Sequence, residues 1–273
     1  MTASGNAGAA HRPRRRFGQN FLVDRSYIER IVSAIAPARG DALLEIGPGQ
    51  GALTAPLLDR IERLYAVEID RDLARALTER FSPERLVLFC EDALEFDYAQ
   101  LPSPLRVVGN LPYNVSTPLL FRLEAYASRF LDLHFMLQRE VVDRMVAAPS
   151  TPAYGRLSVM LQRRFELERL FVVPPGAFHP QPAVHSAVVC LRPRAAVIAD
   201  DVSDAGFRRV VSAAFSGRRK TLRNALAGLL EGGQIVAAGI DAGLRPENLG
   251  VAEFAELARI YERNTGGAPI HKG

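Results

Sequence analysis

The stretch Leu43–Gly51, which reads LLEIGPGQG, decides the fold class of this chain. A short apolar run over residues 42–46 predicts a buried strand, and the glycine-rich turn after it opens a helix that is expected to end near Asp59. Glycine carries no Cβ, so a turn of this composition allows the backbone to approach a ligand closely. A strand, a glycine turn and a helix in this order predict a ligand site at the carboxyl edge of a sheet.

The same alternation of strands and helices continues along the chain. Strand-like apolar runs occupy residues 64–69, 86–90, 105–108 and 133–137, and helical spacing occupies residues 26–36, 70–80, 118–126 and 140–146. This alternation predicts a parallel sheet that is covered by helices on both faces. Two later β-rich runs, 170–173 and 186–191, predict a hairpin added at the end of the sheet.

The pattern changes after Pro193, because residues 201–265 show only helical periods and predict three or four helices. The predicted fold class is therefore α/β, with a Rossmann-like sheet and a small all-α C-terminal domain. We expect these two domains at residues 16–195 and 200–273, after a disordered basic tail at residues 1–15. The tail is favoured over a short transit peptide because a compact motif follows it directly.

Composition limits the class of protein. The chain has 273 residues, of which 48% are hydrophobic, enough for a sizeable core. No stretch approaches about 18 consecutive apolar residues, and no secretory pattern is present, so we expect no membrane contact and a cytoplasmic location. Cys90 and Cys190 lie in apolar runs without the paired spacing of a zinc or redox site. We therefore expect both thiols to be buried and reduced, and no metal site.

Basic residues gather in two clusters, although the net charge of +4 is a modest excess. The first cluster comprises Arg12, Arg14, Arg15 and Arg16, and the second comprises Arg218, Arg219, Lys220 and Arg223. Arginine forks onto phosphates and stacks on bases, which favours contacts with RNA. Ordinary solvated faces are the alternative interpretation of each cluster.

Acidic residues lie at the ends of the second and third predicted strands. Glu68 lies 21 residues after Gly47, a distance at which an acid can accept hydrogen bonds from ribose hydroxyls. Asp92 can accept a hydrogen bond from an adenine amine. With the glycine turn, these residues predict a cradle for an adenosine-bearing ligand, either NAD or S-adenosylmethionine. The alternative is that both acids cap the helices that follow them.

The motif Asn110-Leu111-Pro112-Tyr113 follows the fourth predicted strand. An adenine N6 amine is a poor nucleophile because its lone pair is delocalised into the ring. The side-chain oxygen of Asn110 and the carbonyl of Leu111 can accept the N6 hydrogens and turn the lone pair toward a methyl donor. Pro112 stiffens the turn, and Tyr113 offers a face for an extruded base. A Pro-Tyr turn that packs on the sheet edge is the alternative.

Together these motifs resemble the ribosomal small-subunit adenine dimethyltransferase family, whose loss gives kasugamycin resistance. Four separated segments in the right order carry the resemblance, which covers nearly the whole chain: RFGQNFL at 16–22, NLPYNVSTP at 110–118, GAFHPQPAVHS at 176–186 and AFSGRRKTL at 214–222. The third segment departs from the family pattern at Gln181, Ala183 and His185, where proline, lysine and aspartate are usual. No RNA contact is therefore carried over to these three positions.

The resemblance implies an S-adenosylmethionine-dependent methyltransferase that releases S-adenosylhomocysteine. Residues that match the family's cofactor contacts are Asn20, Leu22, Gly47, Gly49, Glu68, Asp92 and Asn110. The implied catalytic group is Asn110, Leu111, Pro112, Tyr113 and Phe178, with Phe178 facing Tyr113 across the target base.

The implied substrate is a pair of adjacent adenines in the 3′-terminal hairpin of 16S rRNA. Both become N6,N6-dimethyladenine through four methyl transfers. The helical domain and the basic residues Arg14, Arg15, Arg16, Arg218, Arg219, Lys220 and Arg223 are expected to dock on the immature small ribosomal subunit. A monomer is expected.

Three other functions compete. A large-subunit rRNA methyltransferase of the macrolide-resistance kind shares the cofactor loops but usually carries isoleucine where this chain has Leu111. An assembly factor that keeps the fold without catalysis would not need the intact Asn110–Tyr113 motif. An NAD-dependent oxidoreductase would leave that motif unexplained.

Overall fold

The computed structural model describes residues 19–112, 115–217 and 219–266. The chain divides into two compact units. Unit 1 comprises residues up to Leu119 together with Arg129–Gln138 and Leu170–Val188, and unit 2 comprises Leu120–Ser128, Arg139–Arg169 and Val189–Gly273.

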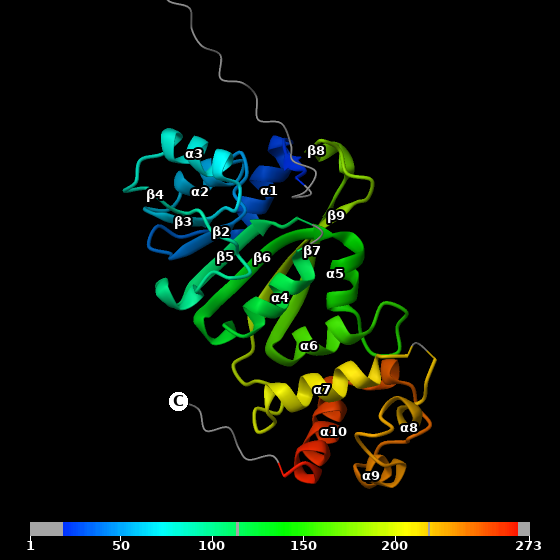
Figure 1. Cartoon of the computed structure of the whole chain (residues 1–273). Helices are drawn as coiled ribbons and strands as arrows, with labels where there is room; N and C mark the ends of the chain where they lie inside the picture. Colours follow the sequence, from blue (N-terminus) through cyan, green and yellow to red (C-terminus); the bar gives the residue numbers. More distant parts are fainter. Residues whose placement is uncertain (1–18, 113–114, 218, 267–273) are drawn as a thin grey trace, which may run out of the picture. The chain divides into compact units, whose positions relative to one another are not determined.

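A parallel sheet forms the centre of unit 1 (Figure 1). Its strands are β2 (Leu43–Ile46), β3 (Leu64–Val67), β4 (Leu86–Phe89), β5 (Leu105–Asn110) and β6 (Phe130–Gln138). Every adjacent pair among these five is parallel, and β2 lies between β3 and β5. The chain thus runs outward through β3 and β4, then returns to the other side of β2. Such a reversal leaves a crevice at the carboxyl ends of the two central strands.

Two later strands complete the sheet, whose order is β4-β3-β2-β5-β6-β9-β7. They are β7 (Phe165–Val173) and β9 (Ser186–Pro193), which are neighbours at the end where the sequence predicted an added hairpin. Both are longer than predicted, because β7 begins at Phe165 and β9 ends at Pro193.

Two helices of unit 1 begin at acidic caps where the chain leaves a strand or loop. Helix α1 (Arg25–Ile35) has Asp24 as its N-cap, and α3 (Arg71–Arg80) has Asp70. The short helix α2 (Thr54–Leu58) starts three residues after Gly51, the last residue of the glycine turn. Leucine, isoleucine and valine side chains from these helices and from the strands form one buried core.

A second, very short sheet joins the N-terminal segment to the loop after β7. Strand β1 (Phe21–Leu22) pairs antiparallel with β8 (Phe178–His179), with Leu22 opposite Phe178. The backbone N–H of Val23 donates to the carbonyl of Ala177 at 2.9 Å and extends this pairing. Strands of two residues have no periodicity, so the sequence did not predict this sheet.

Unit 2 is mainly helical. Its helices are α5 (Arg139–Val146), α6 (Arg156–Arg164), α7 (Asp204–Ala214), α8 (Leu222–Ala225), α9 (Gly232–Ala237) and α10 (Val251–Asn264), and α4 (Ser116–Glu124) ends in it. Short 3₁₀ turns occur in both units, at Tyr98–Gln100, Ala127–Arg129, Pro175–Ala177 and Pro246–Asn248. The predicted helices after residue 200 are present.

Helix α6 was not predicted from the sequence. Its residues Ser158, Val159, Met160 and Leu161 are consecutive and all buried, so they form no single apolar stripe of the kind that marks an amphipathic helix. Val159 and Met160 join the core built by the C-terminal helices. The two compact units therefore do not divide at residues 195–200. The predicted division into a methyltransferase domain at residues 16–195 and a docking domain at residues 200–273 remains a proposal.

One further expectation was wrong. Cys190 is buried, but Cys90 is exposed, because it follows β4, the edge strand of the sheet. Among the described residues, no helix combines the length and the apolar character that crossing a bilayer requires.

Candidate active site

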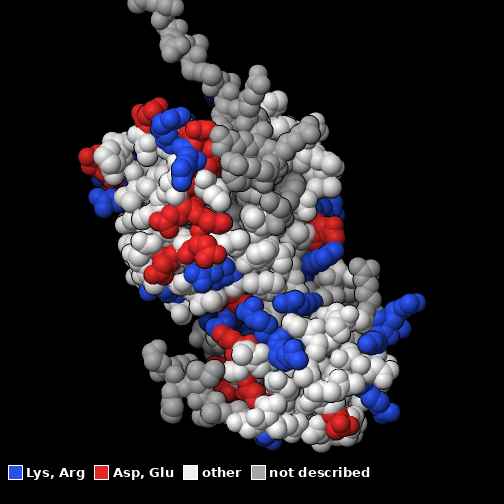
Figure 2. Space-filling view, viewed as in Figure 1, with Lys and Arg blue, Asp and Glu red and all other residues white. Residues whose placement is uncertain are grey.

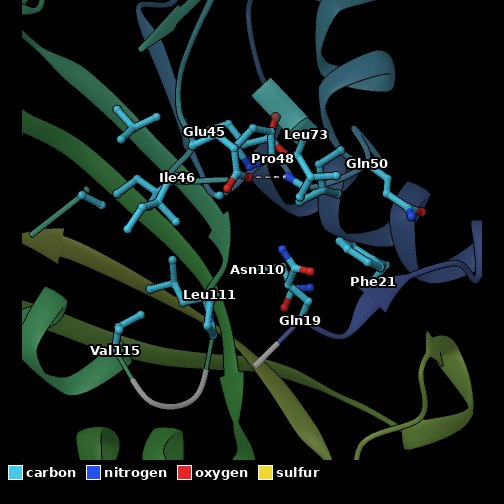
Figure 3. A pocket seen from close by; sticks show the side chains of 18 of the residues that line it. Gln19, Phe21, Glu45, Ile46, Pro48, Gln50, Leu73, Asn110, Leu111 and Val115 are labelled. Atoms are coloured by element: carbon cyan, nitrogen blue, oxygen red, sulfur yellow. Dashed lines mark hydrogen bonds between the residues drawn. The ribbon is translucent and has the colours of Figure 1, made fainter. Parts of the chain in front are cut away.

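A pocket opens in unit 1 at the carboxyl ends of the central strands (Figure 3). The glycine turn, the ends of β3, β4 and β5, and the segment around β1 form its walls. Of the predicted site residues it is lined by Asn20, Leu22, Gly47, Gly49, Glu68, Asp92, Asn110, Leu111 and Pro112. Folding therefore brings together the predicted cofactor residues and the described part of the predicted catalytic motif.

The glycine turn has a backbone that other residues adopt at a cost. Gly47, Gly49 and Gly51 have φ values of 66°, 57° and 81°. A Cβ on Gly49 would also lie 3.1 Å from a ring carbon of Phe21. The turn thus needs glycine at position 49 both for its conformation and for the close approach of β1.

Glu68 ties the glycine turn to the end of β3. Its Oε2 accepts from the backbone N–H of Gly49 at 3.1 Å, and its Oε1 accepts from that of Asp70 at 2.9 Å. The residue is only 5% exposed, and this burial raises the pKa of its carboxyl. Each carboxylate oxygen has a second lone pair, so Glu68 can still accept from a ligand hydroxyl.

The alternative role as a helix cap differs between the two acids. Helix α3 is capped by Asp70, whose side chain accepts from Asp72, so Glu68 is not its cap. Asp92 does accept from the backbone N–H of Leu94 at 2.9 Å and caps the turn after β4. Since only Oδ1 makes this bond, capping and ligand contact are compatible at Asp92.

Asn110 ends β5 with its side chain oriented by a hydrogen bond. Its Nδ2 donates to the backbone carbonyl of Asn20 at 3.0 Å, and the next residue, Leu111, donates its backbone N–H to Met136 at 3.1 Å. Just before it, a Cβ on Gly109 would lie 2.6 Å from the carbonyl oxygen of Ile46. Glycine at 109 therefore lets β5 lie close to β2 at the site.

Sequence reasoning missed Glu45 as a pocket residue. It lines the pocket, is 2% exposed and accepts a hydrogen bond from Thr54 Oγ1 at 2.7 Å. Burial, with a smaller contribution from the nearby Glu68 charge, raises the pKa of Glu45 to about 7. An acidic residue inside an apolar strand, two positions before the first glycine of the turn, was the available signal.

Phe178 does not line the pocket in this structure. Its side chain is 4% exposed and packs in the core of unit 1, and Tyr113 lies outside the described residues. The predicted pair of rings around a target base therefore remains a prediction.

The predicted RNA-binding residues are only partly described. Arg14, Arg15, Arg16 and Arg218 lie outside the described residues. Arg219, Lys220 and Arg223 are exposed on unit 2, and Arg223 belongs to α8.

Solved structures share this architecture. The crystal structure of a dimethyladenosine transferase from Plasmodium falciparum superposes with a TM-score of 0.73 at 22% identity, covering 90% of this chain and 98% of that one. The 23S rRNA methyltransferase ErmE superposes with a TM-score of 0.68 at 27% identity, covering 89% and 100%. The fold and its strand-end pocket thus define the class: an α/β protein with the Rossmann-like fold of methyltransferases.

The sequence is also similar to a described family. The family model for ribosomal RNA adenine dimethylase matches residues 10–263, so the chain belongs to the ribosomal RNA adenine dimethylase family of methyltransferases. The ribosomal RNA small subunit methyltransferase A of Thiobacillus denitrificans is 57% identical over 247 residues, which are 90% of this chain and 97% of that protein. The protein of the same name from Nitrosospira multiformis is 54% identical over 257 residues, 94% and 99% of the two chains.

Proposed function

We propose that this chain transfers methyl groups from S-adenosylmethionine to N6 of two adjacent adenines in the 3′-terminal hairpin of 16S rRNA. Four transfers would give two N6,N6-dimethyladenines during assembly of the small subunit. We also propose that it acts in the cytoplasm as a monomer. The observation that carries the proposal is the oriented amide of Asn110 at the mouth of an acid-lined strand-end pocket.

The pocket residues fit the cofactor. Glu68 offers carboxylate acceptors suited to ribose hydroxyls, and Asp92 offers one suited to an adenine amine. Ile69 and Leu73 line the same pocket and supply apolar surface for the faces of a base. When bound, S-adenosylmethionine supplies a methyl group on a positively charged sulfur. Glu45 and Glu68 are two carboxyl groups in the pocket that favour a cationic ligand when ionised.

Asn110 would prepare the adenine amine. Because Nδ2 is held by the carbonyl of Asn20, Oδ1 is the group left to accept an N6 hydrogen. The Leu111 carbonyl would accept the other, and the two bonds would direct the lone pair toward the methyl group. The amine becomes cationic on transfer and loses its proton to water, so a dedicated base is not required. Positioning and electrostatics would supply most of the acceleration.

Sequence similarity supports the small subunit as the substrate. The relatives named as small-subunit methyltransferases are 57% and 54% identical to this chain, against 27% for the 23S rRNA methyltransferase. Leu111, where the large-subunit enzymes usually have isoleucine, agrees with this choice. The basic residues at 14–16, 218–220 and 223 would contact the RNA of the immature subunit.

The test uses small subunits from a strain that lacks this gene and, in parallel, naked large-subunit RNA, each incubated with labelled S-adenosylmethionine and purified protein. Label recovered as N6,N6-dimethyladenine in the 3′-terminal hairpin, and lost with Asn110→Ala, is the expected result. Asn264→Ala is the matched control, because Asn264 is exposed at the end of α10. Label found only on large-subunit RNA would overturn the small-subunit assignment. Cofactor binding without transfer to either RNA would favour the alternative function of an assembly factor without catalysis.

A further inference from the structure

Two arginines of unit 2 converge on one aromatic ring. The guanidinium carbon of Arg156 in α6 lies 5.4 Å from the ring centroid of Phe121 in α4, and that of Arg208 in α7 lies 5.8 Å from it. We call Phe121, Arg156 and Arg208 the Phe121 patch. Figure 2 shows Lys and Arg side chains gathered on the surface over these helices.

The charges of the patch are poorly neutralised within the described chain. Arg156 is exposed and has no ion pair with a described carboxylate. Arg208 has a side chain that is 43% exposed, and its only described carboxylate partner is Glu124, whose Oε2 lies 3.6 Å away. That distance exceeds a hydrogen bond, so the donors of Arg208 are not consumed by Glu124.

The neighbouring Arg164 differs from these two arginines, because a carboxylate within the protein neutralises its charge. Arg164 has a side chain that is 19% exposed and holds both carboxylate oxygens of Asp204 at 2.6 Å. Its Nη2 is therefore occupied within the protein. Arg156 and Arg208 have no described carboxylate within hydrogen-bond distance, although a guanidinium carries five donors.

The aromatic ring attracts both guanidinium groups. Each guanidinium carbon lies within about 6 Å of the ring centroid, the range of a cation–π interaction, and this interaction leaves the N–H donors available to a ligand. Phe121 thus brings two cations together with donors to spare. Paired forks of this kind are suited to phosphate oxygens, which take bidentate hydrogen bonds from arginine.

The occupant follows from the proposed function, on which this inference rests. Phe121 belongs to α4, the helix that follows the Asn110–Tyr113 motif directly in the chain, so an RNA presented to that motif is the polyanion at hand. We propose that the Phe121 patch binds the phosphodiester backbone of the RNA substrate. It fixes the position of the RNA without reading its sequence, since phosphate contacts carry no base information.

The test measures RNA affinity against salt. The observed association constant for deproteinised 16S rRNA is measured at several KCl concentrations for wild type and for Arg156→Ala/Arg208→Ala. Each phosphate contact contributes about 1 to the slope of the logarithmic plot, so the slope should decrease by about 2 in the double variant. The matched control is Arg39→Ala/Arg60→Ala, which removes two exposed arginines of unit 1 and should leave the slope unchanged.

Further measurements exclude trivial causes. Cofactor affinity by calorimetry and the melting temperature should match wild type, and Arg156→Gln/Arg208→Gln, which keeps polar side chains without the charges, should repeat the Ala result. In steady-state transfer to small subunits, KM should rise while kcat stays near wild type, as expected when only uniform binding is lost.

The outcomes separate this inference from the proposed function. If wild type methylates small subunits and the patch variant keeps the wild-type slope, the patch proposal is overturned and the function stands. If the slope falls but wild type transfers no methyl group, the RNA surface stands and the function fails. If binding to deproteinised RNA is unchanged and binding to intact subunits weakens, the patch meets a ribosomal protein and the proposal is overturned.

Discussion

The side-chain Nδ2 of Asn110 donates a hydrogen bond to the backbone carbonyl oxygen of Asn20, 3.0 Å away. This bond links the end of β5 to the segment before β1, which is itself paired with β8. Three parts of the chain that are distant in sequence therefore share one hydrogen-bonded frame. The frame sets which atom of the Asn110 amide can accept from a substrate.

The first prediction follows from the polarity of that bond. Asn110→Asp keeps the size of the side chain but replaces its donor with a carboxylate oxygen, which is repelled by the Asn20 carbonyl. We expect kcat to fall by about 10²–10³, the range seen when one oriented catalytic hydrogen bond is lost. The rate of methyl transfer at a saturating concentration of small subunits measures this loss of kcat. An Asp variant with a kcat near wild type would show that the Asn20 contact does not orient the acceptor.

The second prediction separates backbone strain from steric collision in the glycine turn. Gly47 and Gly49 both have positive φ, but a Cβ on Gly47 meets nothing within 4 Å, whereas one on Gly49 lies 3.1 Å from the Phe21 ring. Gly47→Ala should cost about 1–2 kcal/mol from strain alone. Gly49→Ala should cost more, because the Phe21 ring must move and β1 moves with it.

Urea unfolding of both variants measures the difference. Phe21→Leu removes the ring and should recover the excess cost of Gly49→Ala, leaving only the strain. Equal stabilities for Gly47→Ala and Gly49→Ala would mean that β1 shifts without cost.

The central sheet and the main pocket residues could be predicted because their signals are local. Gly47 and Gly49 lie in a turn with its own composition, and Glu68 and Asn110 each follow an apolar run, so strand ends were visible in the sequence. Parallel strands then place these ends at one edge of the sheet. The chemistry of the site was thus available from position along the strands.

Other features depend on long-range packing and could not be predicted. The β1–β8 pairing joins residues more than 150 positions apart through two residues each. Glu45 stood inside an apolar run, where its neighbours predicted only a strand. Cys90 was the last residue of such a run, but its exposure depends on β4 being the edge strand, which the order of elements did not fix.

The third prediction concerns a buried ion cluster at the start of β5. Arg106 donates to both oxygens of Asp132, at 3.0 and 2.7 Å, and to Asp41 at 2.7 Å. Arg106→Met would leave both carboxylates without their cation. The free energy of unfolding at pH 7 should fall by about 3–5 kcal/mol, the usual cost of breaking a buried ion pair from one side.

Acid should act on the same cluster. Burial raises the pKa of Asp132, but the neighbouring His134 and Arg106 outweigh it and lower that pKa to about 2. The contribution of ionised Asp132 to the free energy of unfolding is therefore present above pH 3.8, its pKa in an unfolded chain, and is lost as pH falls toward 2. Denaturant unfolding between pH 2 and 5 should show this loss in wild type and a weaker one in Arg106→Met. Parallel profiles would contradict the assignment.

The fourth prediction concerns Glu45, whose pKa is raised rather than lowered on folding, so the change of stability with pH has the opposite sign. Its pKa is 4.5 in the unfolded chain and about 7 in the folded one, chiefly through burial. Below pH 4.5 both states hold the proton; between 4.5 and 7 only the folded state does. Stability should therefore decrease by about 3 kcal/mol as pH rises through this window, since one pKa unit corresponds to about 1.4 kcal/mol.

Two variants isolate that effect. Glu45→Gln stays neutral and can still accept from Thr54, so its stability should fall less between pH 5 and 8, and it should exceed wild type at pH 8. Glu124 in unit 2 is 3% exposed, and burial also raises its pKa to about 7, so it should account for a residual slope. Glu45→Gln/Glu124→Gln should flatten the profile further and leave only the contribution of Glu68, whose pKa burial also raises. Urea unfolding across this range tests both, and a Glu45→Gln profile that parallels wild type would show that Glu45 ionises normally.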